Sequence, residues 1–145
     1  MRGTKPRVLI ADDEEVIADT LAMILSQAGF ETQAVYSGEE ALSILHDFNP
    51  DMLISDVIMS GITGIETAIR VRALLPSCKV LLFSGQATTR NLLDVASAQG
   101  YEFELLTKPI HPADLLARMR AVQEDAGELS STGEAAPPVR RNRSE

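Results

Sequence analysis

Short apolar runs alternate along the chain with longer segments in which apolar residues recur at helical spacing. Val8 to Ala11 is one such run, and the apolar residues after it are spaced three or four apart up to Gly29. This pattern predicts a strand followed by a helix that stops at a glycine. The succession recurs four more times, with further strands expected at residues 30–36, 52–55, 80–83 and 101–107. Repeated β-α units predict a parallel sheet covered by helices on both faces.

The composition of the runs also predicts their order in the sheet. The runs that begin at Val8, Met52 and Val80 are almost wholly apolar, as strands buried on both faces must be. Residues 31–33 and 102–104 mix polar and apolar side chains, which is typical of edge strands. The simplest arrangement is a doubly wound α/β sheet of five strands in the order 2-1-3-4-5, a flavodoxin-like topology.

Two helix starts carry capping boxes. Ser37 is followed three residues later by Glu40, and Thr63 by Glu66. A serine or threonine at this position accepts a hydrogen bond from the first turn of the helix. We therefore expect helices to begin directly after Ser37 and Thr63.

The C-terminal end differs from the rest of the chain in composition. Ala126 to Glu145 is rich in small and polar residues and has almost no large apolar side chain, so it is not expected to order itself. We expect an N-terminal extension at 1–6, one domain at 7–125 and a disordered tail at 126–145. A tail of this length cannot form a DNA-binding domain or an enzyme. We therefore expect a stand-alone module whose output is another protein.

Charge and cysteine content exclude several classes of function. The 13 Lys and Arg against 21 Asp and Glu give a net charge of −8, which opposes non-specific attraction to a polyanion, so no direct DNA binding is expected. No window reaches the roughly 18 uninterrupted apolar residues of a membrane helix. Cys78 is the single cysteine, which excludes an internal disulfide. A cytoplasmic protein without a membrane partner is expected.

Polar side chains follow four of the predicted strands. They are Asp12 and Asp13, Asp56, Ser84, and Lys108. The carboxyl ends of parallel strands meet at one edge of a sheet, so these side chains are expected to share one crevice near the chain reversal.

Carboxylates brought together in this way repel each other. The repulsion is about 4 kcal/mol for a pair roughly 4 Å apart at an effective dielectric of about 20. A protonated carboxyl group or a divalent cation would offset it, and hard oxygen ligands suit Mg²⁺. With Mg²⁺ bound, a carboxylate can form an acyl phosphate, and Asp56 is the best-placed nucleophile. Lys108 and Ser84 could then contact phosphoryl oxygens.

The order and spacing of these motifs resemble the receiver domain of bacterial response regulators, over Arg7 to Gln123. The resemblance implies a signalling module that catalyses only its own phosphorylation and dephosphorylation. Asp56 would accept a phosphoryl group from a sensor histidine kinase, or exchange one with a histidine phosphotransfer protein. A downstream protein target would read the phosphorylated state, and the last two β-α units would carry partner docking or a homodimer contact.

The resemblance also implies a role for each site residue. Asp13, Asp56 and the main-chain carbonyl of Ile58 would hold Mg²⁺, and Asp12 would reach it through water. Lys108 would contact the phosphoryl group, and its bond to the following proline would be cis. Ser84 would be the switch hydroxyl that moves toward the phosphate.

Two positions depart from the family pattern. Leu105 stands where the family usually has Tyr or Phe, a ring that moves together with the switch hydroxyl, so a weaker switch is expected. Ser60 stands where proline is common, and we expect it to loosen the loop without stopping the chemistry. Ile58 and Gln86 flank the expected phosphate.

Two other functions remain open. One is a receiver-like module that binds metal and partner constitutively, with phosphorylation silent because Leu105 interrupts the relay. The other is a Mg²⁺-dependent phosphohydrolase with an aspartyl phosphate intermediate. Such enzymes generally have a second Asp two residues after the nucleophile, and this chain has Ile58 there.

Overall fold

The computed structural model describes residues 5–85, 94, 97, 98, 100, 103–107 and 111–132. Several predicted features lie outside these residues. They are the apolar side chains Leu92, Leu93, Val95 and Ala96 that predict the fourth helix, together with Gln86, Lys108 and Pro109. The chain divides into two compact units, Met1–Ile110 and His111–Glu145, which are described in turn.

The first unit contains a five-stranded parallel sheet in the order β2-β1-β3-β4-β5, as the composition predicts. The strands are β1 (Arg7–Ala11), β2 (Glu31–Val35), β3 (Met52–Asp56), β4 (Lys79–Ser84) and β5 (Glu104–Thr107). Every residue of β3 is buried, whereas β2 and β5 contain exposed residues. The mixed composition of the second and fifth strands therefore does mark the edges of the sheet.

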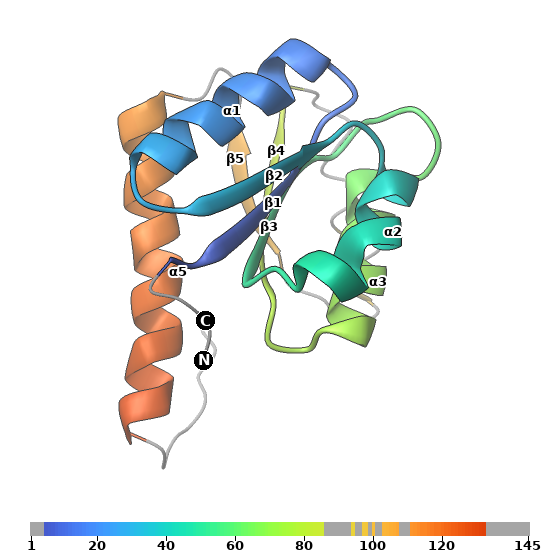
Figure 1. Ribbon diagram of the computed structural model, residues 1–145. Coiled ribbons are helices and arrows are strands. Elements are labelled where there is room, and N and C mark those ends of the chain that lie inside the picture. The colour runs from blue at the N-terminus through green and yellow to red at the C-terminus, as the bar shows by residue number, and fades with distance from the viewer. Residues whose placement is uncertain are drawn as a thin grey trace. The chain divides into compact units, whose positions relative to one another are not determined.

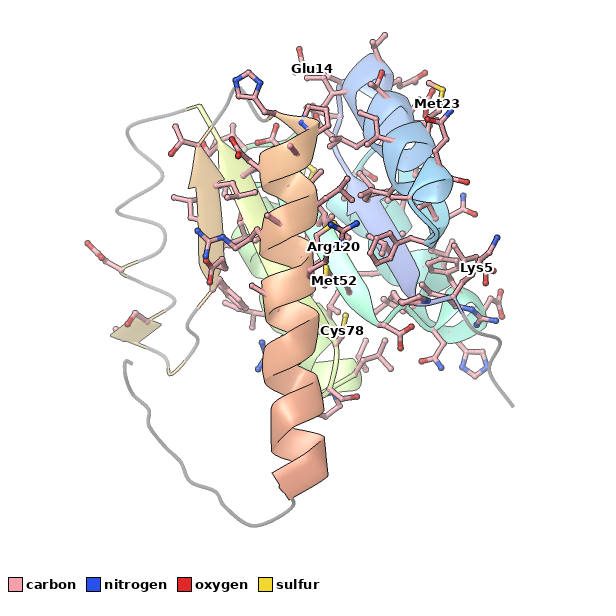
Figure 2. All side chains as sticks on the ribbon, turned by 90° about the vertical axis from the view of Figure 1, so that its left-hand side faces the viewer. Lys5, Glu14, Met23, Met52, Cys78 and Arg120 are labelled. Atoms are coloured by element: carbon pink, nitrogen blue, oxygen red, sulfur yellow. The ribbon has the colours of Figure 1, made fainter. Side chains whose placement is uncertain are left out.

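Among the described residues of this unit, the helices that cover the sheet are α1 (Glu15–Gln27), α2 (Gly38–Phe48) and α3 (Gly64–Leu74). Figure 1 shows α1 on one face and α2 with α3 on the other. Strand residues alternate between the faces, so Leu9, Leu53 and Leu82 join the cluster formed with α2 and α3. The buried side of α1 consists of Ala18, Leu21 and Leu25. Met23 lies on its outward side (Figure 2), where the residue is 56% exposed.

Both predicted capping residues accept a backbone hydrogen bond. Ser37 Oγ accepts from the Glu40 N–H at 3.0 Å, and Thr63 Oγ1 accepts from the Glu66 N–H at 3.0 Å. The Glu40 carboxylate in turn accepts from the Tyr36 N–H at 2.8 Å, one residue before the cap. The starts of α2 and α3 are thus fixed by side chains that the sequence pattern identifies.

The second unit contains α5 (Pro112–Thr132). The helix extends beyond residue 125, where the tail was expected to begin. Ala126, Glu128 and Leu129 favour helix, and extending an existing helix costs much less than nucleating a new one. Among the described residues, no helix is both long and apolar enough to cross a membrane.

Candidate functional site

The carboxylates predicted to share a crevice lie together at the carboxyl end of the sheet. Ala11 pairs with Ser55 in the register of β1 and β3, so Asp12 and Asp56 follow at the same level of neighbouring strands. One oxygen from each of Asp12, Asp13 and Asp56 lies within 4.8 Å of the others. The strand order predicted from composition thus brings together acids that are far apart in the sequence.

The three carboxylates differ in their exposure to solvent. Asp12 is fully buried and Asp56 is 7% exposed, whereas Asp13 is exposed. Unit charges 4.8 Å apart repel by about 3.5 kcal/mol at an effective dielectric of about 20. Mg²⁺ prefers oxygen ligands and usually takes one or two carboxylates and several waters, which two of these three side chains could supply. The donor set therefore fits a divalent cation.

Backbone contacts fix the position of Asp12. Its Oδ1 accepts a hydrogen bond from the N–H of Glu14 at 2.9 Å, and its own N–H donates to the carbonyl of Val35 at 3.2 Å. Glu14 is the N-cap of α1, and the positive end of a helix dipole favours a nearby anion. The start of α1 thus helps to stabilise a buried negative charge beside Asp56.

The main chain of Asp56 is held by a close approach of Gly64. A Cβ atom at position 64 would lie only 1.9 Å from the Asp56 carbonyl oxygen, a distance that a side chain cannot occupy. The Gly64 N–H donates to the carbonyl of Val57 at 2.7 Å, and Ser55 Oγ donates to the Asp56 carbonyl at 2.9 Å. The sequence pattern places Gly64 directly after a predicted capping residue but does not predict this packing role. A glycine in the first turn of a helix that already has a capping threonine is the available signal.

Ser60 contacts one of the site carboxylates directly. Its N–H donates to Asp13 Oδ2 at 2.9 Å and its hydroxyl donates to the same oxygen at 3.1 Å. These hydrogen bonds attach the loop to Asp13, and a proline here could not donate the backbone one; that serine loosens the loop stays a prediction. The pattern of the sequence contains no signal for this pairing.

Glu39 holds the same loop from the side of α2. Its Oε2 accepts from the N–H of Ile62 at 3.2 Å. Gly61 has a φ of +81°, and a Cβ atom there would lie 2.6 Å from the Glu39 carboxylate. Sequence reasoning misses Glu39, because an acid in the first turn of a helix is adequately explained by the helix dipole.

The remaining predicted site residues are placed in part. Ser84 is the last residue of β4 and is 4% exposed. It follows Phe83, which pairs with Asp56 in the register of β3 and β4. Ile58, two residues after Asp56, is 38% exposed, and Leu105 on β5 is 37% exposed. Lys108 lies outside the described residues, so its contact with the phosphoryl group stays a prediction.

Comparison with known proteins gives consistent matches. The family model described as "Response regulator receiver domain" matches residues 8–120. The DNA-binding response regulator MtrA of Mycolicibacterium smegmatis is 28% identical over 92% of this chain, and the phosphate regulon transcriptional regulatory protein PhoB of Pseudomonas aeruginosa is 30% identical over 83%. A CheY-like response regulator receiver domain from Methanospirillum hungatei superposes with a TM-score of 0.76 at 25% identity, covering 86% of this chain and 99% of that one.

These relatives correct one expectation. The match covers 59% of MtrA and 52% of PhoB, so this chain spans little more than half the length of either. MtrA is a DNA-binding response regulator, which contradicts the prediction of no direct DNA binding. The net charge of −8 is a sum over these 145 residues, and such a sum does not by itself exclude DNA binding.

Proposed function

Because the chain belongs to the family of response regulator receiver domains, a family of signalling modules, we propose that it is a phosphoacceptor in which Asp56 takes the phosphoryl group. The observation that carries this proposal is the meeting of Asp12, Asp13 and Asp56 oxygens within 4.8 Å. A cluster of this kind is electrostatically costly unless it binds a cation or a transferring group. Asp56 lies at the end of β3, the middle strand of the sheet.

We propose that Asp13, Asp56 and the main-chain carbonyl of Ile58 hold Mg²⁺, and that Asp12 reaches it through water. The cation would neutralise the cluster and the charge on the incoming phosphoryl oxygens, as it does in phosphoryl transfer generally. Asp13 is exposed to solvent, whereas Asp12 is fully buried. Access from solvent would therefore be on the side of Asp13.

The proposed reaction moves a phosphoryl group from nitrogen to oxygen. A carboxylate oxygen of Asp56 attacks the phosphorus of a phosphohistidine on a sensor kinase or phosphotransfer protein. The P–O bond forms as the P–N bond breaks, and the imidazole leaves and takes up a proton. Asp56 is 7% exposed, so its nucleophilic oxygen would work in a site with little bulk water, where electrostatic stabilisation is strongest.

We propose that Ser84 transmits the modified state. A phosphoryl group on Asp56 adds about two negative charges and three acceptor oxygens, and the Ser84 hydroxyl at the end of the neighbouring strand would donate to one of them. Lys108 would neutralise another. Movement of Ser84 would alter packing around Leu105 and change the affinity of a downstream macromolecule. By analogy with MtrA, that output includes DNA binding when the module is part of a longer chain.

Leu105 favours a second candidate, a constitutive binding module. Leucine is smaller than the aromatic ring typical of the position and is already 37% exposed, so its movement would change the surface less. Partner or DNA affinity measured with and without beryllofluoride distinguishes the two functions. Equal affinity in both states supports the constitutive module, and a change of several-fold supports the switch.

Intact-mass spectrometry after incubation with acetyl phosphate and Mg²⁺ tests the phosphoacceptor function. The wild type should gain the mass of one phosphoryl group, and Asp56→Asn should gain none, because an amide is a far poorer nucleophile. Asp47→Asn is the matched control, since Asp47 is an exposed acid on α2. Equal labelling of Asp56→Asn and wild type would refute the assignment of Asp56.

A further inference from the structure

Ser60 joins two loops that meet at the site. It lies in the loop between β3 and α3, and Asp13 follows β1, 47 residues earlier in the chain. Both of its donors go to the same atom, with the N–H at 2.9 Å and the hydroxyl at 3.1 Å from Asp13 Oδ2.

Two donors on one oxygen set the orientation of a carboxylate. Each carboxylate oxygen has two lone pairs, so two donors can occupy Oδ2 fully and leave Oδ1 for another partner. Hydrogen bonds behind a metal ligand fix its direction, and their removal typically lowers metal affinity about 10-fold to 100-fold. We infer that Ser60 is a positioning residue that orients Asp13 for a divalent cation and so raises cation affinity. This inference rests on the proposed function of the site.

The chemistry of residue 60 would then grade cation affinity. Alanine keeps the backbone donor and removes the hydroxyl, proline removes both donors, and threonine keeps both. Serine therefore supplies two hydrogen-bond donors to Asp13 that the proline common at this position in the family cannot supply. The graded set separates an effect of the hydrogen bonds from an effect of side-chain size.

The rest of the loop is anchored without the Ser60 side chain. Ile62 is held by Glu39, and Gly64 donates to the carbonyl of Val57 at 2.7 Å. Loss of the Ser60 hydroxyl therefore leaves both ends of the loop attached to their neighbours. A change in cation affinity in Ser60→Ala would come from Asp13 and not from a detached loop.

The test is an NMR titration with MgCl₂, in which ¹⁵N–¹H amide shifts give the dissociation constant for each variant. The Mg²⁺ dissociation constant should rise about threefold in Ser60→Ala and about tenfold in Ser60→Pro, at the weak end of such effects because the pair is exposed. Ser60→Thr keeps both donors, so its dissociation constant should equal that of the wild type. The control is Ser43→Ala, which loses an exposed hydroxyl bonded within α2 at 2.7 Å to the Glu40 carbonyl and should leave the constant unchanged.

Other outcomes would overturn the inference. An unchanged constant in Ser60→Ala, or a lower one, would mean that Ser60 is neutral or competes with the cation for Asp13. A dissociation constant for Ser60→Thr as high as that of Ser60→Ala would mean that the size of the side chain, and not its hydrogen bonds, sets the affinity. If Ser60→Pro does not fold, the alanine and threonine variants decide the question alone. Absence of saturable Mg²⁺ binding in the wild type would refute the proposed metal site itself, and this result is distinct from a failure of Ser60.

Discussion

Neutralising Asp13 should have opposite effects on stability in the absence and in the presence of Mg²⁺. Asp13 faces two other carboxylates with oxygens within 4.8 Å, and each pair repels by about 3.5 kcal/mol at an effective dielectric of about 20. Because Asp13 is exposed, solvent and salt reduce this to about 1 kcal/mol for each pair. Asn removes both repulsions but weakens the hydrogen bonds from Ser60, which costs about 1 kcal/mol. In EDTA, Asp13→Asn should therefore be more stable than wild type by about 1 kcal/mol.

Added Mg²⁺ should reverse the order. At a concentration one hundred times its dissociation constant, the cation stabilises the wild type by about 2.7 kcal/mol. A variant that has lost a ligand and binds about 100-fold more weakly gains about 0.4 kcal/mol. The difference of about 2.3 kcal/mol exceeds the advantage in EDTA, so the wild type becomes more stable by about 1.3 kcal/mol.

Urea unfolding followed by circular dichroism measures both differences. The Mg²⁺ samples are compared with NaCl at matched ionic strength, and Asp47→Asn serves as the control for loss of an exposed acid. Its difference from wild type should be the same in both conditions. The same order of stability for Asp13→Asn and wild type with and without Mg²⁺ would refute the claim that Asp13 is both a repelling charge and a ligand.

Two further predictions concern the packing around the site and the core. Gly64→Ala should lower the free energy of unfolding by about 3 kcal/mol, because its Cβ would lie 1.9 Å from the Asp56 carbonyl oxygen; a loss below about 0.5 kcal/mol in urea unfolding would contradict this close approach. Cys78 is buried just before β4 (Figure 2), and burial raises the pKa of its thiol to about 12. The folded state holds this proton more tightly than the unfolded state does. The stability that the protonated Cys78 thiol contributes is therefore complete below pH 9 and is lost as the pH rises from 9 toward 12. Thiol labelling at pH 8 should accordingly follow the unfolding rate, and rapid labelling of the native protein would contradict the burial.

The parts of the fold that the sequence predicts are those governed by periodicity. Apolar runs at Val8, Met52 and Val80 define the buried strands because both faces of such a strand are covered and its side chains are therefore nearly all apolar. Once the strand order is fixed, parallel pairing alone brings Asp12 beside Asp56. The cluster is therefore a consequence of topology, and the sequence is sufficient to predict it.

The parts that it does not predict depend on loop conformation. The contacts of Ser60 with Asp13, of Glu39 with Ile62 and of Gly64 with Asp56 join residues whose spacing has no regular period. Their geometry follows from how a short loop closes between β3 and α3. The extension of α5 past residue 125 is a different case, since composition predicts disorder whereas propagation of an existing helix continues through Ala126, Glu128 and Leu129.

The most direct test of the central claim is chemical mapping of the phosphorylated residue. After incubation with acetyl phosphate and Mg²⁺, borohydride reduces an aspartyl phosphate to homoserine, and peptide mass spectrometry locates that residue. Homoserine should be found at position 56 and should be absent when EDTA replaces Mg²⁺. Homoserine at another aspartate, or at position 56 to the same extent in EDTA, would contradict a Mg²⁺-dependent phosphoacceptor at Asp56.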